Sequence, residues 1–300
     1  MSETWIRGST LLLTFAVFVG FSFYLPGTSE QGLQSLIFAI FMITAIFAAL
    51  VQQVMPQFIF QRDLYEVRER PSKTYHWAAF MMANILVEIP YSTVLGIMVF
   101  GAFTYPVFGI TSSQYQGLLM LFCIQFFVFG STFAHMVVAA LPDAETAGQI
   151  ATLLFYLTLV FNGVLLPRIN LPGFWIFMYR VSPMTYIVNG IATAVGGRVV
   201  RCANNELSVF QPPPNTTCGQ YMERYLQAAG AAAGSLYNPD ATRNCAYCSL
   251  RVTDQFLAAR DIKPDQRWRD FGIVWAYICF NIAAAVSLYY IFRVKVWRKH

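Results

Sequence analysis

The sequence predicts an all-α polytopic membrane protein with six transmembrane helices. Hydrophobic residues make up 57% of the 300 residues and charged residues only 12%, whereas soluble chains carry roughly 25% charged residues. The charges also leave long uncharged runs, and a bilayer core needs about 20 apolar residues per helix. The net charge is only +5 and the basic residues are scattered, so the dense basic face of a nucleic-acid-binding protein is not expected.

The spans follow from the uncharged runs, which are residues 8–29, 31–61, 89–142, 146–167 and 271–292. The run 89–142 is too long for one helix, and turn-forming residues between 105 and 114 divide it. Its first half extends back across Glu88 to Trp77, because only that carboxylate interrupts the apolar residues after Lys73. The expected spans are 8–25, 33–55, 77–104, 115–140, 147–167 and 271–292.

The first span has an alternative interpretation as the apolar core of a signal peptide. Against it, the first ten residues carry Glu3 and Arg7 and have no net positive charge, and the apolar run continues to the length of a full span.

We therefore expect residues 1–167 to form spans one to five with a cytosolic loop at 56–75. Residues 168–270 form an extracellular loop, and residues 271–300 form span six and a cytosolic tail.

The distribution of basic residues in the short loops predicts the orientation. If the N-terminus is cytosolic, the outer loops 26–32 and 105–114 contain no Lys or Arg. The inner segments then hold nine, as the positive-inside rule requires: Arg7, Arg62, Arg68, Arg70, Lys73, Arg293, Lys295, Arg298 and Lys299. The segment 168–270 also contains basic residues, but loops longer than about 60 residues translocate largely regardless of charge.

The loop 168–270 has the chemistry of an extracellular segment. It holds Cys202, Cys218, Cys245 and Cys248, together with a glycosylation sequon at Asn215. Disulfides are favoured over a zinc site, because the first two cysteines are too far apart for a zinc knuckle. We favour nested bridges, Cys202 to Cys248 and Cys218 to Cys245, which staple both arms of the loop. The crossed pairing remains as the alternative.

Residues 181–197 are uncharged but too short for a span, and Ser182-Pro183 and Gly196-Gly197 interrupt them. This pattern predicts a pair of re-entrant or interfacial helices. Three aromatic residues are expected at the level of the lipid headgroups, namely Trp175, Tyr179 and Tyr186.

The chain contains no phosphate-binding loop of the P-loop type and no pair of histidines at helical zinc spacing. Both absences argue against ATP binding by this chain and against a metal-dependent enzyme. The polar residue that points to a membrane function is Glu88, since intramembrane charges usually face a bundle interior or water. Its alternative role is to bond the backbone that Pro90 leaves unpaired.

Several strings resemble a known family. Residues 61–75 (QRDLYEVRERPSKTY) are similar to the first cytosolic loop of the fungal pleiotropic drug resistance ABC transporters, the G-type exporters. Residues 174–183 (FWIFMYRVSP), 217–222 (TCGQYM) and 267–269 (RWR) are similar to later signatures of the same family. The chain as a whole resembles the C-terminal transmembrane half of such a transporter.

The resemblance implies partners and a location. The expected partners are a nucleotide-binding domain that holds ATP and Mg, a second transmembrane half, the lipid bilayer and amphipathic small molecules, with no nucleic acid and no cofactor or metal on this chain. The expected location is the plasma membrane. Because the family's nucleotide-binding domain and connecting helix are not in this sequence, we expect a truncated product, one exon of a mis-split gene, or a half that requires a partner.

The resemblance also assigns site residues. A cavity between two halves would be lined by residues of spans two and five: Phe41, Thr44, Phe47, Phe155, Thr158, Leu159 and Asn162. The segment 161–165 (FNGVL) is similar to the family's exit gate, which implies Val164 and Leu165 as the gate. The coupling residues would be Arg62, Asp63, Glu66, Arg68, Glu69 and Arg70. The alternative for the cavity residues is ordinary helix packing, and for the coupling residues a solvated helical turn.

The expected function is therefore ATP-driven efflux of amphipathic drugs or lipids, with ATP hydrolysed on another domain. One alternative is a truncated or accessory membrane protein that does not transport by itself. The other is a membrane enzyme, which would need a catalytic polar cluster that the sequence does not show.

Overall fold

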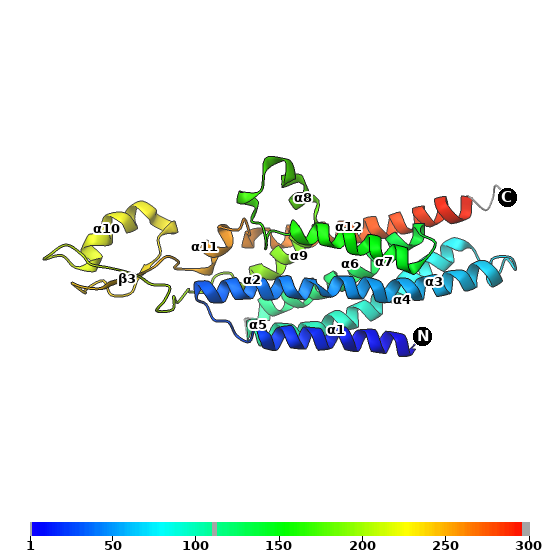
Figure 1. The fold of residues 1–300 in the computed structure, drawn as a ribbon, viewed down its shortest axis with the longest axis horizontal. Coiled ribbons are helices and arrows are strands. Elements are labelled where there is room, and N and C mark those ends of the chain that lie inside the picture. The colour runs from blue at the N-terminus through cyan, green and yellow to red at the C-terminus, as the bar shows by residue number, and fades with distance from the viewer. Residues whose placement is uncertain (1, 110–112, 296–300) are drawn as a thin grey trace.

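The computed structural model describes residues 2–109 and 113–295, and it is an elongated helical bundle with a small mixed module at one end (Figure 1). The long helices run roughly parallel to the long axis. The start of the first helix and the end of the last lie at the same end of the bundle, opposite the mixed module. The basic residues Arg298 and Lys299 of the predicted tail, and part of the predicted turn after 105, lie outside the described residues.

The bundle contains α1 (Ser2–Ser22), α2 (Glu30–Thr44), α3 (Ile46–Leu64), α4 (Trp77–Val99), α5 (Tyr105–Phe108), α6 (Ser113–Ala140), α7 (Ala144–Val160) and α12 (Arg267–Tyr289). Short π-helical segments extend α3 over Tyr65–Glu69, α4 over Phe100–Thr104 and α12 over Tyr290–Val294. Four helical stretches within the described residues are long and apolar enough to cross a membrane: Glu30–Glu69, Trp77–Phe108, Tyr115–Ala140 and Pro264–Val294. Two shorter apolar helices, Ile6–Ser22 and Ala144–Val160, coincide with the other two predicted spans.

Local chemistry explains where several helices begin. The Ser29 hydroxyl accepts a hydrogen bond from the Gly32 N–H at 3.1 Å and caps α2. The Asp143 carboxylate accepts from the Thr146 N–H at 2.7 Å and caps α7. These oxygens satisfy amides that the first turn of a helix leaves unpaired.

Two element boundaries differ from those expected. The second helical stretch does not end at residue 55 but continues to Glu69, so most of the expected loop 56–75 is helical. Charges begin at Arg62, which marks the edge of an apolar run but does not end a helix. In contrast, α7 ends at Val160 and not at 167, because Gly163 has a left-handed φ of 85° that a helix cannot contain.

The core of the bundle lies around α6, which packs against α3, α4, α7 and α12. Gly96 of α4 allows a close approach to α6, since an added Cβ would lie 2.7 Å from the Ile124 Cα. The Gln125 amide of α6 donates to the Phe271 carbonyl of α12 at 2.8 Å. Helix packing through small residues and single polar bonds is typical of membrane bundles.

The uncharged segment 181–197 holds one α-helix, α9 (Pro183–Ala192), and a short 3₁₀ turn over Thr193–Val195, whereas the second short helix, α8 (Ile176–Val181), precedes it and meets α9 at Ser182. Helix α9 is almost entirely buried against α6, α7 and α12, whereas α8 protrudes from the side of the bundle (Figure 1). Of the three aromatic residues expected at headgroup level, Trp175 is exposed, Tyr186 is half-buried and Tyr179 is buried.

Residues 199–252, here called the cysteine module, form part of the predicted disulfide-bonded loop and contain a small sheet that the sequence did not predict. An isolated bridge between Val199 and Val252 closes the module. It contains α10 (Cys218–Ala229) and an antiparallel sheet of β1 (Ser208–Phe210), β2 (Ser235–Leu236) and β3 (Cys245–Cys248), in the order β1-β3-β2. Helix α11 (Thr253–Ala258) then leads towards α12. Such short strands leave no run of alternating residues from which a sheet could be predicted.

Both disulfides of the module involve the central strand. Cys202 is bonded to Cys248 and Cys218 to Cys245, which is the nested pairing, with sequence separations of 46 and 27 residues. Because β3 lies between β1 and β2, one bridge at each of its ends ties the N-terminal arm and helix α10 to the same strand. The bridges therefore hold together a module whose own apolar core is small.

Candidate functional site

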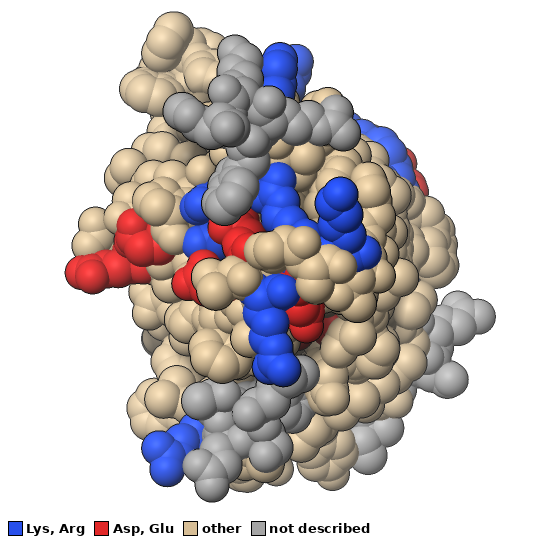
Figure 2. Space-filling view, turned by 90° about the vertical axis from the view of Figure 1, so that its right-hand side faces the viewer, with Lys and Arg blue, Asp and Glu red and all other residues tan. Residues whose placement is uncertain are grey.

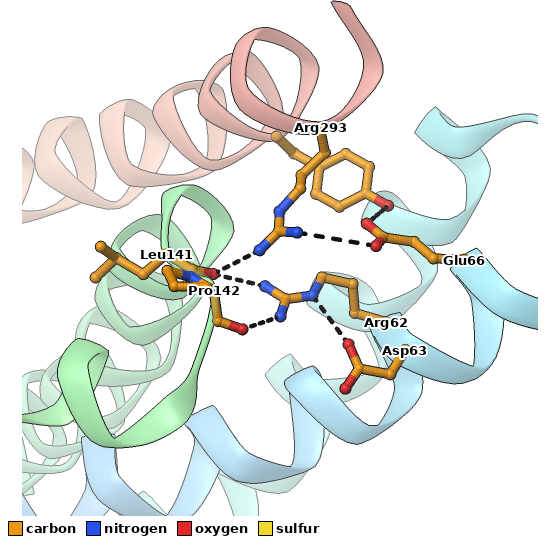
Figure 3. Close-up of polar contacts among 7 residues, drawn as sticks. Arg62, Asp63, Glu66, Leu141, Pro142 and Arg293 are labelled. Atoms are coloured by element: carbon orange, nitrogen blue, oxygen red, sulfur yellow. Dashed lines mark hydrogen bonds and ion pairs between the residues drawn. The ribbon is translucent and has the colours of Figure 1, made fainter. Parts of the chain in front are cut away.

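Charged side chains gather at the end of the bundle that lies opposite the cysteine module (Figure 2). Arg62 is the centre of this group and is only 1% exposed. Its guanidinium donates to the Leu141 carbonyl at 2.7 Å and to the Pro142 carbonyl, and lies 3.5 Å from the Asp63 carboxylate (Figure 3). These carbonyls follow the last turn of α6, where unpaired carbonyl groups favour a cation.

A second arginine reaches the same carbonyl from the other side. Arg293, just beyond α12, donates to Leu141 at 3.0 Å and lies 3.9 Å from the Glu66 carboxylate (Figure 3). The Tyr289 hydroxyl donates to Glu66 at 3.4 Å. Three elements distant in sequence, the end of α3, the α6–α7 turn and the end of α12, are thus joined in one polar network, here called the arginine cluster (Arg62, Glu66, Leu141, Arg293).

The six predicted coupling residues therefore divide into three pairs. Arg62 and Glu66 face inwards and belong to the arginine cluster, whereas Asp63 and Arg68 are exposed. Val67, next to Arg68, is 80% exposed. The outward face of this segment is consequently a short patch around Val67 and Arg68.

Glu69 and Arg70 are half-buried where the segment turns towards α4. The Glu69 carboxylate accepts a hydrogen bond from the Tyr75 hydroxyl. Burial and this bond raise the pKa of Tyr75 to about 12. The ring of Tyr65 stacks on that of Phe80, with the ring centroids 4.6 Å apart, and its centroid lies 5.2 Å from that of Tyr75. Aromatic packing therefore stabilises the turn between α3 and α4.

Most of the predicted cavity residues lie inside this chain's own core. Phe47 and Phe155 stack on each other with ring centroids 5.1 Å apart, and each is at most 3% exposed. Thr44 is buried, and its hydroxyl donates to the Phe41 carbonyl at 2.6 Å. Phe41, Thr158 and Leu159 are half-buried, and Asn162 is fully buried. The structure brings spans two and five together through the stacked rings of Phe47 and Phe155.

The predicted gate segment forms a tight turn after α7. The Asn162 side-chain oxygen accepts from the Val164 N–H at 3.0 Å, and Gly163 presses against Tyr179 of α8, where an added Cβ would lie 2.9 Å from the ring. Val164 is buried in the core, whereas Leu165 is 50% exposed. Of the two residues, only Leu165 is available to contact another molecule.

Glu88 lies half-buried on α4, two residues before Pro90. Within the described part of the chain its carboxylate makes no hydrogen bond or ion pair. It therefore does not bond the backbone freed by Pro90, and its side chain remains available in the apolar stretch.

A polar contact that the sequence did not reveal joins the cysteine module to the bundle. The Glu206 carboxylate accepts from the N–H groups of Glu30 at 3.2 Å and Gln31 at 2.8 Å, at the start of α2, and from Ala203 at 3.0 Å. Ser249 donates to the Glu30 carboxylate at 3.2 Å. Arg260, after α11, donates to Gln34 at 2.6 Å. Residues some 175 positions apart cannot be paired from spacing alone.

Asn215 of the sequon is exposed in the loop before α10. The sequon's Thr217 hydroxyl accepts from the Gln220 N–H at 3.3 Å and caps that helix. The asparagine side chain is thus presented on a well-anchored loop.

Among the described residues, no three His, Cys, Asp or Glu side chains are grouped so that they would hold a metal ion. The sequence also lacks a phosphate-binding loop.

The fold and these features define a multi-pass helical membrane protein with the arginine cluster at one end and the disulfide-bonded cysteine module at the other. The family model described as ABC-2 type transporter matches residues 4–195. The chain is 58% identical over 282 residues to the ABC multidrug transporter atrI of Aspergillus fumigatus, covering 94% of this chain and 19% of that protein. It is 55% identical over 297 residues to the ABC multidrug transporter MDR1 of Trichophyton equinum, covering 98% of this chain and 19% of that protein.

The ABC-type transporter adrC of Penicillium roqueforti is 53% identical over 280 residues, covering 93% of this chain and 19% of that protein. The chain thus spans about a fifth of the length of these relatives. It belongs to the ABC-2 type transporter family and corresponds to a membrane domain of fungal ABC multidrug transporters.

Proposed function

We propose that this chain is a transmembrane domain of a plasma-membrane ABC exporter of the pleiotropic drug resistance type. It moves amphipathic drugs or lipids outwards, and the driving ATP is hydrolysed on a separate nucleotide-binding domain. The relatives named as multidrug transporters support this class of activity. The orientation proposed here places the arginine cluster in the cytosol and the cysteine module outside.

The observation that carries the proposal is the arginine cluster. Arg62 and Arg293 both donate to the Leu141 carbonyl and so connect the ends of α3, α6 and α12. A push on the exposed patch around Val67 and Arg68 is transmitted to three helices at once, because the patch continues directly from the buried end of α3. This is the mechanical link that a nucleotide-binding domain requires.

In this proposal the second transmembrane half lies against α7. Only Ala147, Gly148, Ala151 and Phe155 of that helix are buried, and the large apolar residues on its other faces are exposed. Leu165 and those outer residues of α7 would then face the transport path, while Phe47 and Phe155 support it from behind. Leu165 closes the exit by excluding water.

The test is a charge reversal in the assembled transporter, made from this chain, its nucleotide-binding domain and the second half. We expect Arg68→Glu to lower drug efflux while ATP hydrolysis and surface expression continue, because Arg68 is exposed and makes no internal ion pair in the described structure. Glu66 is less suitable, since its reversal also breaks the contact with Arg293.

The matched control is Arg224→Glu on α10, an equally exposed arginine in the cysteine module. Efflux and ATP hydrolysis are measured side by side in membranes of known transporter content. Efflux that is unchanged by Arg68→Glu would contradict the coupling role of this patch.

A further inference from the structure

A basic pocket lies beside α8 and the start of α12, and one of its lining residues, Tyr179, also packs against Gly163 of the predicted gate segment. It has a volume of about 360 Å³ and is lined by residues of α8 and α9, by Arg168, and by the segment 261–273. Four of the lining residues are cations, namely Arg168, Arg180, Lys263 and Arg269, and Asp261 is the one carboxylate that lines it.

Only half of this positive charge is compensated by the chain. Arg168 is paired with Asp261 at 2.5 Å, and Arg269 with the neighbouring Asp270 at 2.8 Å. The exposed side chains of Arg180 and Lys263 form no hydrogen bond or ion pair with any described residue. Two cations facing one pocket repel each other, and an anion between them removes that repulsion.

The surroundings of the pocket place it at the edge of the bilayer. Exposed apolar side chains flank it on the α8 side, where Phe174 is 74% and Ile169 is 84% exposed, and at the start of α12, where Trp268 is 58% exposed. Aromatic residues of this kind gather where lipid chains meet headgroups. A pocket close in sequence to these side chains, at the start of the apolar stretch Pro264–Val294, is placed to meet a lipid headgroup.

We propose that this pocket binds the phosphate group of an anionic ligand, held by Arg180 and Lys263 and flanked by the two paired arginines. Guanidinium groups match phosphate oxygens through paired hydrogen bonds, and a lysine adds a compact charge. The same chemistry is offered by a phospholipid headgroup and by a free phosphate. The site does not depend on the proposed export activity, because none of its residues belongs to the arginine cluster or to the exposed face of α7.

The test uses the full chain purified in dodecyl maltoside, a detergent without phosphate, and calorimetric titration at fixed ionic strength. The probes are short-chain dihexanoyl phosphatidic acid and inorganic phosphate. We expect the parent chain to bind the lipid and the double variant R180Q/K263Q to bind it at least about tenfold more weakly, since two charged hydrogen-bond donors are removed.

The matched control is R224Q/R243Q, which removes the same charge from exposed positions of the cysteine module. It should bind like the parent, and circular dichroism should show that both double variants are folded. Competition by inorganic phosphate identifies phosphate alone as sufficient, whereas binding of the lipid without such competition identifies a lipid headgroup as the source. Equal affinity of the parent and R180Q/K263Q, or failure of the parent to bind either probe, would overturn the proposal.

Discussion

At the scale of single residues, Arg62 shows how a charged side chain is accommodated inside the bundle. Its guanidinium contacts two carbonyl groups just after α6, those of Leu141 and Pro142, and the carboxylate of its neighbour Asp63 on α3. Arg68, six residues later, has the same side chain and is exposed. The sequence shows both as members of one alternating charge run, and only the packing of α3 against the α6–α7 turn separates their roles.

This contrast predicts different effects on stability. Arg62→Gln should lower the free energy of unfolding by about 3 kcal/mol, because the Leu141 and Pro142 carbonyls lose a charged donor in a buried site. Arg68→Gln should change it by less than about 0.5 kcal/mol, as expected of an exposed residue. Thermal unfolding of the purified chain in detergent measures both, and equal effects of the two variants would show that Arg62 is not held as described.

At the scale of elements, the contact between the cysteine module and α2 depends on one carboxylate. Burial of Glu206 opposes ionisation, but hydrogen bonds from the N–H groups of Gln31, Ala203 and Glu30 outweigh it and lower its pKa. Because the folded pKa is depressed, the stabilisation is present above the ordinary glutamate value of about 4.3 and is lost as the pH falls through the folded pKa.

We therefore expect the amide of Gln31 to lose protection from hydrogen exchange only as the pH falls below the ordinary glutamate range, and Glu206→Gln to reduce that protection already at neutral pH. Glu223→Gln, an exposed glutamate of α10, is the matched control and should leave the Gln31 amide unchanged. Full protection of Gln31 in Glu206→Gln would show that the module is held on α2 by other contacts.

The long helices could be predicted because their signal is the amino-acid composition of each segment. The uncharged runs, together with the turn-forming residues that divide the run 89–142, located four helical stretches long enough to cross a membrane and two shorter apolar helices, because charged side chains are costly in lipid. The ends of the helices were not predictable in this way. Helix α3 continues beyond its apolar part, and α7 ends shortly before Gly163, which has a positive φ. The sheet of the cysteine module was missed because its strands are only two to four residues long.

At the scale of the whole molecule, the sequence could not predict which side chains point into the core of the bundle and which point outwards. In a membrane helix every face is apolar, so there is no periodicity to separate the core face from the outer face. Phe47 and Phe155 were expected in a cavity between two halves, and the structure places them against each other within one half. Whether a residue faces the core, the lipid or a partner is decided by helix packing and not by its type.

The placement of α7 leads to a prediction about where substrate binds, which rests on the proposed export activity. Tyr156 is 57% exposed on the outer face of α7, whereas the adjacent Phe155 is 3% exposed and stacked on Phe47. In the assembled transporter, Tyr156→Ala should alter drug resistance and drug-stimulated ATP hydrolysis without changing the unfolding temperature. Phe155→Ala should cost about 3 to 5 kcal/mol of stability, because it leaves a cavity among packed rings.

The matched control is Leu86→Ala on α4, which removes an apolar side chain of similar exposure, 56%, from another helix. Its effect on transport should be small, because α4 packs mainly against α6 and α1. If Phe155→Ala instead keeps its stability and changes the range of drugs exported, the transport path must run between α3 and α7. The two helices would then have to separate when the second half binds, and the stacked pair Phe47 and Phe155 would be the contact that opens.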